Sequence, residues 1–213
     1  MDRERKESDI RIIFDAISKQ SYVRPEEIPD IPLYMDQVTS FLDEKLSPFK
    51  RFDEDKLLTK TMINNYTKNN LLPPPDKKKY SKNHMILLIF IYYMKHFLSI
   101  SDIKKIFAPL SEKFFEDESE LDIEDIYKYV FDMEVKGMDV LAKDVYKKFN
   151  ISKTAFPKLE NEDDNEILST FAYICMLSFD VYVKKIIIET LIDNRFNDNA
   201  DDKDNKDKKD SKK

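Results

Sequence analysis

The residues whose types could do chemistry are concentrated in one stretch of the chain, residues 56–84. This stretch contains seven lysines and a single acid, Asp76, although the whole chain has a formal net charge of −6. Segregated positive charge beside a helix-sized polar face is what binding to a phosphate backbone requires. A lysine-rich stretch can equally be a solvated face without a ligand, because lysine is mostly exposed in any protein. Spacing alone leaves both interpretations open.

Residues 60–69 have the spacing of a short amphipathic helix. Thr59 is the expected N-cap, and Met62, Ile63 and Tyr66 share the side that faces the core. The opposite side is polar, and its asparagines combine a donor and an acceptor that suit the adenine edge in a major groove. The hypothesis is a recognition helix that offers double-stranded DNA the residues Lys60, Thr61, Asn64, Asn65, Tyr66 and Lys68.

A basic segment follows this helix. Asn69 and Asn70 can end the helix in a left-handed conformation, where glycine is usual. Prolines at 73–75 then stiffen an extended segment, and Ser81 is expected to cap the next helix. The pattern predicts a short, rigid wing over residues 77–82 whose side chains would hold flanking phosphates, namely Lys77, Lys78, Lys79, Tyr80 and Lys82.

Helices must position this stretch. Residues 5–19 carry one apolar stripe and are expected to form a bracing helix, and a second helix is expected over 32–46. An unusually long connection separates that helix from Thr59. Residues 82–98 are apolar almost all round and predict a central buried helix, and a serine-capped helix should follow up to residue 110.

The second half of the chain is acidic. Residues 112–166 contain 17 acids and 8 lysines. Helical spacing continues across Gly137 and predicts one long helix, or two nearly collinear ones, over 122–149, and an apolar helix over 166–192 is its candidate partner. Cys175 lies in the apolar run of that last helix and is expected to be buried.

Composition limits the remaining classes. One glycine and no tryptophan favour a mainly α fold. A single cysteine, the lack of a signal-peptide pattern and apolar runs shorter than about 20 residues predict a cytoplasmic chain without a membrane span. Two histidines and no glycine-rich loop suggest neither an enzyme nor a metal or cofactor site; His84 is expected at the surface.

Three segments carry a resemblance to a known family. They are residues 63–74 (INNYTKNNLLPP), the pair Tyr80-Ser81, and residues 99–104 (SISDIK). Together they resemble the DNA-binding domain of MerR-type bacterial regulators, over about fifty residues. The matching positions are Tyr66, Lys68, Leu71, Leu72, Pro73, Tyr80, Ser81 and Ile103. More closely still, the chain looks like a bacterial domain-of-unknown-function family whose N-terminal part is related to this winged helix-turn-helix.

The chain also departs from the MerR pattern. Asn64 stands where that family usually has a phosphate-contacting arginine, and Asn65 stands where a tyrosine follows. The wing is shorter and has no glycine. The connection before Thr59 is longer than the three to four residues or so of a helix-turn-helix.

The resemblance and the residue pattern together predict a mainly α fold. A MerR-like winged helix-turn-helix domain is expected at 1–110, an acidic linker at 111–120, a C-terminal helical region for dimerisation or an effector at 121–195, and a disordered charged tail at 196–213. The expected function is a transcriptional regulator that binds promoter DNA as a homodimer through its C-terminal helices. The alternative is a non-catalytic protein-interaction adaptor on a winged-helix scaffold that no longer binds DNA.

Overall fold

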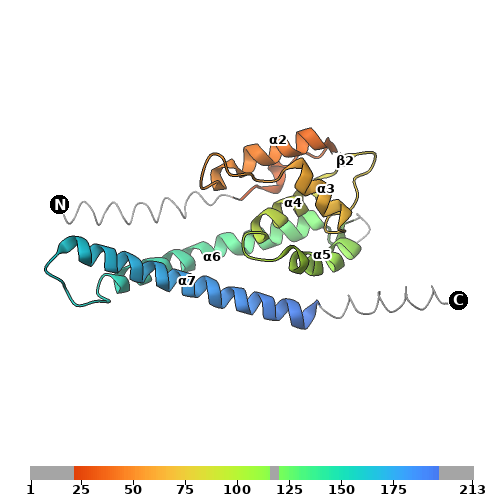
Figure 1. The fold of residues 1–213 in the computed structure, drawn as a ribbon. Coiled ribbons are helices and arrows are strands. Elements are labelled where there is room, and N and C mark those ends of the chain that lie inside the picture. The colour runs from red at the N-terminus through yellow and green to blue at the C-terminus, as the bar shows by residue number, and fades with distance from the viewer. Residues whose placement is uncertain (1–21, 116–119, 197–213) are drawn as a thin grey trace, which may run out of the picture. The chain divides into compact units, whose positions relative to one another are not determined.

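The structure, a computed structural model, describes residues 22–115 and 120–196 (Figure 1). These residues are mainly helical, as the composition predicts. The expected bracing helix at 5–19 and the charged tail beyond residue 196 lie outside them. The elements in chain order are η1 (Pro25–Glu27), β1 (Leu33–Tyr34), α2 (Met35–Leu46), η2 (Ser47–Phe49), α3 (Lys60–Lys68), β2 (Lys79–Tyr80), α4 (Lys82–Met94), α5 (Ile100–Phe114), α6 (Ile123–Ser152) and α7 (Glu162–Arg195).

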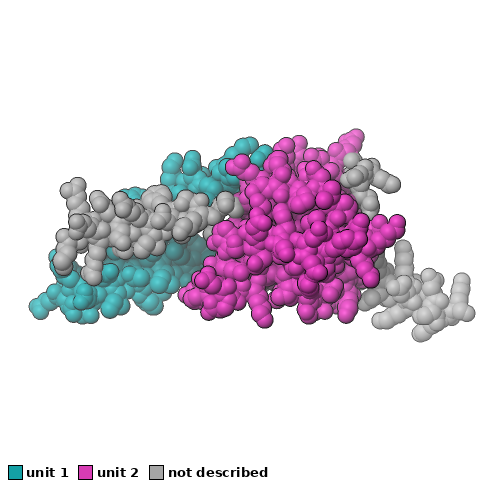
Figure 2. Space-filling view, turned by 90° about the horizontal axis from the view of Figure 1, so that it is seen from above, with its two compact units in different colours: residues 1–21, 132–187 teal, residues 22–131, 188–213 magenta. Residues whose placement is uncertain are grey.

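The chain divides into two units, which Figure 2 colours separately. Among the described residues, unit 2 (magenta) contains 22–131 and 188–196 and is called the domain below; unit 1 (teal) contains 132–187 and is called the hairpin. This division differs from the predicted boundary at 111–120. Helix α5 continues to Phe114, and the first turns of α6 belong to the domain because Ile123 and Tyr127 are buried in its core.

Helix α4 is the centre of the domain. It is apolar around its whole circumference, which is the pattern of a helix enclosed on every side by other elements. Helix α2 adds three buried residues at four-residue spacing, and α5 adds Ile103 and Phe107. The fully buried residues of α4 are Met85, Ile86, Leu87, Leu88, Ile89 and Ile91.

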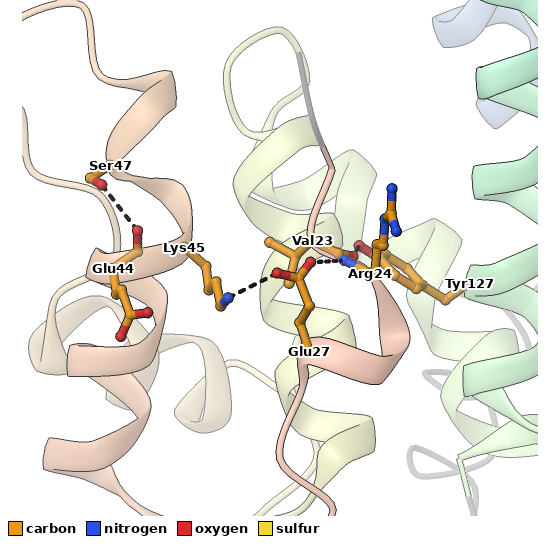
Figure 3. A network of polar contacts seen from close by, with 7 residues as sticks. All are labelled: Val23, Arg24, Glu27, Glu44, Lys45, Ser47 and Tyr127. Carbon is orange, nitrogen blue, oxygen red and sulfur yellow. Dashed lines mark hydrogen bonds and ion pairs between the residues drawn. The ribbon is translucent and has the colours of Figure 1, made fainter. Parts of the chain in front are cut away.

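Residues 23–27 make polar contacts with the rest of the domain (Figure 3). Glu27 accepts the backbone N–H of Arg24 at 2.9 Å and pairs with Lys45 of α2 at 2.9 Å. The hydrogen bond from Lys45, then that from Arg24, lowers the pKa of Glu27. The buried hydroxyl of Tyr127 donates to the carbonyl of Val23 at 2.5 Å. These contacts join the segment to α2 and to the start of α6.

A two-stranded antiparallel sheet joins two distant parts of the domain. Leu33 of β1 pairs with Tyr80 of β2, and Tyr34 pairs with Lys79. Because β1 leads directly into α2 and β2 directly into α4, the sheet fixes the segment after α3 against both helices.

In the hairpin, α6 and α7 run antiparallel. The rings of Phe149 and Tyr173 meet edge to face with centroids 5.6 Å apart. Lys148 pairs with both Asp144 of its own helix and Asp180 of α7. The long helix predicted across Gly137 and its partner are therefore confirmed in position. Across 22–115 and 120–196, no helix is long and apolar enough to cross a membrane.

Candidate nucleic-acid interface

Helix α3 starts where its cap predicts. The hydroxyl of Thr59 accepts the backbone N–H of Met62 at 3.2 Å, which satisfies one of the free amides of the first turn. Ile63 and Tyr66 are buried and Met62 is half-buried, so the predicted inward side is confirmed. The inward residues thereby fix which side of α3 points to solvent.

The outward side of α3 consists of polar residues without a carboxylate. No acid occurs anywhere in this helix. A short polar face of this kind can enter a groove of DNA without like-charge repulsion from the phosphates. The exposed residues are Lys60, Thr61, Asn64, Asn65 and Lys68.

One of these cations already has a partner. Lys60 forms an ion pair with Asp36 of α2, and both side chains are largely exposed. Exposed pairs contribute little to stability, about 0 to 1 kcal/mol, so a phosphate can replace the carboxylate at small cost.

Asparagine ends α3 in the predicted way. Asn70 has a φ of 54°, in the left-handed region, and the amide side chain of Asn69 donates to the carbonyl of Asn65 at 2.9 Å. The N–H groups of Leu71 and Leu72 both donate to the carbonyl of Tyr66. The chain therefore turns sharply and buries both leucines in the core.

The lysines that follow form a tight turn. The N–H of Lys79 donates to the carbonyl of Asp76 at 2.8 Å, and the two central residues, Lys77 and Lys78, have φ values of 45° and 66°. Two positive φ values in succession are the pattern of a type I′ turn, which usually takes asparagine or glycine. Lysine in this conformation is strained by about 1 kcal/mol at each position.

The predicted wing is therefore this turn plus β2, and β2 pairs with β1 rather than with a second strand of a hairpin. Lys77, Lys78 and Lys79 are all exposed. The ammonium of Lys79 lies 5.2 Å from the ring centroid of Tyr34, across the sheet. The turn thus carries its lysines on a backbone that the sheet holds in place.

Three predicted contact residues have a different environment from the one expected. Tyr66 is only 8% exposed and Tyr80 is also buried, so both support the surface from below. Burial raises the pKa of each tyrosine, and for Tyr80 a hydrogen bond with Thr67 opposes that rise.

Lys82 is the third of these residues. Its ammonium pairs with Asp30 at 2.7 Å and with Glu124 of α6 at 3.0 Å, and its side chain is largely buried. Partial burial acts to lower the pKa of Lys82, but its hydrogen bonds with Asp30 and Glu124 outweigh that effect and raise it. Lys82 therefore links the start of α4 to α6.

His84 was expected at the surface, and that prediction is wrong. The side chain is buried, with edge-to-face rings on two sides, Tyr80 at 5.5 Å and Phe115 at 4.8 Å. Its Nδ1 accepts the backbone N–H of Ser81 at 3.1 Å, as glutamate does in a capping box. Desolvation lowers the pKa of His84, against a smaller opposing effect of the backbone at Pro74 and Pro73. A capping serine followed three residues later by histidine was the signal for this role.

The fold and this surface define a class: a small helical domain that presents a carboxylate-free helix and a lysine turn, followed by a helical hairpin. Residues 23–130 match the family model of DUF1836, a domain of unknown function. The chain therefore belongs to the DUF1836 family, whose model covers the domain up to residue 130 and does not extend into the hairpin. Comparisons with curated proteins and with solved structures found no significant match.

Proposed function

We propose that this protein is a DNA-binding transcriptional regulator whose domain acts as a MerR-like winged helix-turn-helix. Helix α3 enters the major groove of promoter DNA, and the lysine turn at 77–79 contacts the flanking phosphates. The observation that carries the proposal is the pairing of an acid-free exposed helix face with a strained turn of exposed lysines.

The strain in the turn favours a function for these lysines. Lys77 and Lys78 adopt left-handed backbone conformations, although asparagine or glycine would adopt them with less strain. Both side chains are exposed, so burial in the core does not account for their presence. Strained residues of this kind concentrate at functional sites. Two cations on a rigid turn lose little freedom when they meet phosphates.

The asparagines suit direct reading of bases. Asn64 and Asn65 are both exposed on α3, and an asparagine amide can bond both N6 and N7 of adenine. Asn64 stands at the position where MerR-type regulators, which residues 63–74 resemble, usually have a phosphate-contacting arginine. The proposal therefore assigns base contact to α3 and most of the phosphate contact to the lysine turn.

Two copies of the domain would read two half-sites. A homodimer formed through the C-terminal helices supplies both domains, and half-sites one helical turn apart lie about 34 Å from each other. The connection at 47–59 is longer than a usual helix-turn-helix turn, so the angle at which α3 enters the groove differs from that of a tight motif.

The test is a mobility shift with promoter fragments, or selection of sites from genomic DNA, at low salt. Wild-type binding should weaken steeply with salt, and the triple variant Lys77→Glu, Lys78→Glu, Lys79→Glu should abolish it. Three lost phosphate contacts correspond to a decrease of about three in the slope of log affinity against log salt.

A matched triple variant controls for overall charge. Lys136, Lys143 and Lys147 are exposed on α6 in the hairpin, and their change to glutamate alters the net charge equally. This control should retain most of the binding. Absence of binding to every upstream fragment at low salt, or equal loss in both triple variants, would overturn the proposal.

The ion pairs of the domain favour a second candidate, a protein-interaction adaptor without DNA contact. Lys82 is held by Asp30 and Glu124, and Lys60 by Asp36, which leaves fewer free cations than the sequence offers. A pull-down that retains a protein partner after the triple change at 77–79, with no enrichment of DNA, would favour this candidate.

A further inference from the structure

Helix α7 has an exposed apolar surface in the hairpin. Its two phenylalanines are 60% (Phe171) and 66% (Phe179) exposed. Contiguous apolar surface of this size marks an interaction site in proteins that are otherwise charged. The large apolar residues of α7 in the hairpin that are more than half exposed are Ile167, Phe171, Ile174, Phe179, Val181, Tyr182 and Ile187.

Helix α7 has large apolar side chains on both of its sides. Tyr173, Met176 and Leu177 are half-buried, and Tyr173 contacts Phe149 of α6, while Asp180 pairs with Lys148 of α6. The hairpin therefore covers one apolar side of the helix and leaves a second apolar side exposed. A helix that is apolar all round belongs inside a larger assembly.

The outward side chains have the spacing of a helix-packing seam. Positions 167, 171, 174, 178 and 181 follow one another at alternating steps of four and three residues. This is the repeat with which one helix packs its side chains between those of another helix. The seam is called the α7 seam below.

The charge pattern identifies the kind of partner. From 167 to 183 the only charged residue is Asp180, which already has its partner in α6. A neutral apolar face does not bind nucleic acid. Acidic residues at 162–166 flank the seam at one end and Lys184 and Lys185 flank it at the other, so a second α7 in the opposite direction would place each acidic end beside a basic one. A second neutral helix face is the complement that remains.

The area is of the size that a dimer needs. Ile167, Phe171, Ile174, Phe179, Val181, Tyr182 and Ile186 are 43 to 66% exposed. With roughly 150 to 200 Å² for each complete side chain, they offer on the order of 700 Å² of accessible surface. A stable interface takes about 800 Å² from each partner.

We propose that the α7 seam is a homodimer interface, in which α7 of one copy packs against α7 of a second copy about a two-fold axis near Ile174. A two-fold axis places the same patch on both copies, so a self-complementary apolar seam satisfies both at once. This inference specifies the dimer of the proposed function and rests on that function for its purpose, although the association itself requires no DNA.

The experiment measures the oligomeric state of the full chain by light scattering and sedimentation. The wild type is expected to be a dimer at micromolar concentration, and Phe171→Glu and Val181→Glu should each weaken association at least thirtyfold or so, as for a hot-spot residue. Phe52→Glu is the matched control, because Phe52 is a 53% exposed aromatic residue outside the hairpin. Circular dichroism should show the same helix content in all variants.

The single cysteine gives an independent readout. Cys175 is exposed and adjacent to Ile174. A two-fold axis near Ile174 brings the cysteines of the two copies within about 15 Å, because each lies one residue from that axis, a rise of about 1.5 Å, and packed helix axes are about 8 to 10 Å apart. A short bismaleimide should therefore crosslink wild-type dimers at this position and should fail with the two glutamate variants.

Several results would overturn the interface. They are a monomer at concentrations of about 100 µM, a dimer that both glutamate substitutions leave intact, a dimer without crosslinking at Cys175, and a monomer in which residues 1–21 protect the seam from hydrogen exchange. A dimer that binds no DNA would refute only the proposed function. A monomer that binds a half-site would refute only the interface.

Discussion

Helices α4 and α7 are both rich in apolar residues, but one is buried and the other is largely exposed. Both are apolar around most of their circumference. Six consecutive or nearly consecutive residues of α4 are fully buried, whereas eight large apolar residues of α7 are more than half exposed. The domain supplies α2, α3 and α5 to form the core around α4. Within the hairpin only α6 packs against α7 along the described residues.

This difference shows that an apolar helix predicts burial but does not tell which element will bury it. Helix α4 is buried by other helices of its own domain. For α7 we propose that a second copy buries it. Changes in the two helices should therefore respond differently to protein concentration, which is the basis of the first prediction.

The largest expected effect comes from a cavity in the domain. Leu87→Ala removes a fully buried side chain of α4 and should lower the free energy of unfolding by about 2 to 5 kcal/mol at any protein concentration. Phe171→Ala should lower the stability of the hairpin only at concentrations where the dimer forms. Urea unfolding at protein concentrations that span about a hundredfold range distinguishes the two alanine variants. A concentration-independent loss for Phe171→Ala would break the comparison.

Within the domain, the lysine turn should separate stability from binding. Lys77→Asn with Lys78→Gly fits the left-handed conformations and should stabilise the domain by about 1 to 2 kcal/mol. It should also weaken DNA binding, with a salt slope lower by about two. Lys77→Gln with Lys78→Gln removes the same charges without relieving the strain. Equal stability of the two double variants would contradict the assignment of strain.

His84 should make the domain, and not the hairpin, sensitive to acid. Burial lowers its pKa below the ordinary 6.5, so the unfolded chain binds the proton more tightly between those two values. Its effect on stability is absent above pH 6.5. As the pH falls below 6.5 towards the folded-state pKa, stability should decrease by up to about 1.4 kcal/mol per unit.

The variant His84→Gln isolates this effect, because glutamine can keep the capping contact with Ser81 and does not titrate. Urea unfolding at pH values of about 7.5 and 5.5 should show a smaller loss of stability for the variant than for the wild type. A fluorophore on Cys175 reports the hairpin separately. Identical pH dependence in both proteins would refute the role of His84.

The smallest expected effect concerns the start of α3. Thr59→Ala removes the acceptor for the N–H of Met62 and should cost about 1 kcal/mol of domain stability. Thr59→Ser retains the hydroxyl and should cost much less. Thermal unfolding of both variants measures the difference. The hairpin should be unaffected, and equal losses for the two variants would show that the cap contributes nothing.

Local signals in the sequence were sufficient for the elements and their caps. Thr59 begins α3, Asn70 ends it in the left-handed conformation, and Ser99 caps α5 with a hydrogen bond of 3.1 Å from the N–H of Asp102. These features involve residues at most a few positions apart, so their spacing along the chain is enough to predict them.

The predictions that failed or changed depend on contacts between distant residues. Lys82 pairs with Asp30 and Glu124, and His84 is covered by Phe115, none of which is near in sequence. Cys175 was expected to be buried and is exposed, because the side of α7 that faces α6 is the other one. Charge and periodicity alone do not reveal such partners.

By itself, the sequence determined the helical class, the two long helices, and a basic stretch between a capped helix and a central apolar helix. Composition and periodicity suffice for these because helix formation and amphipathic burial are local. Only the tertiary structure decided which lysines remain exposed, that the predicted wing is one strained turn followed by a strand paired to β1, and which face of α7 is exposed. Those outcomes depend on pairings across the chain, whose geometry exists only once the core has formed.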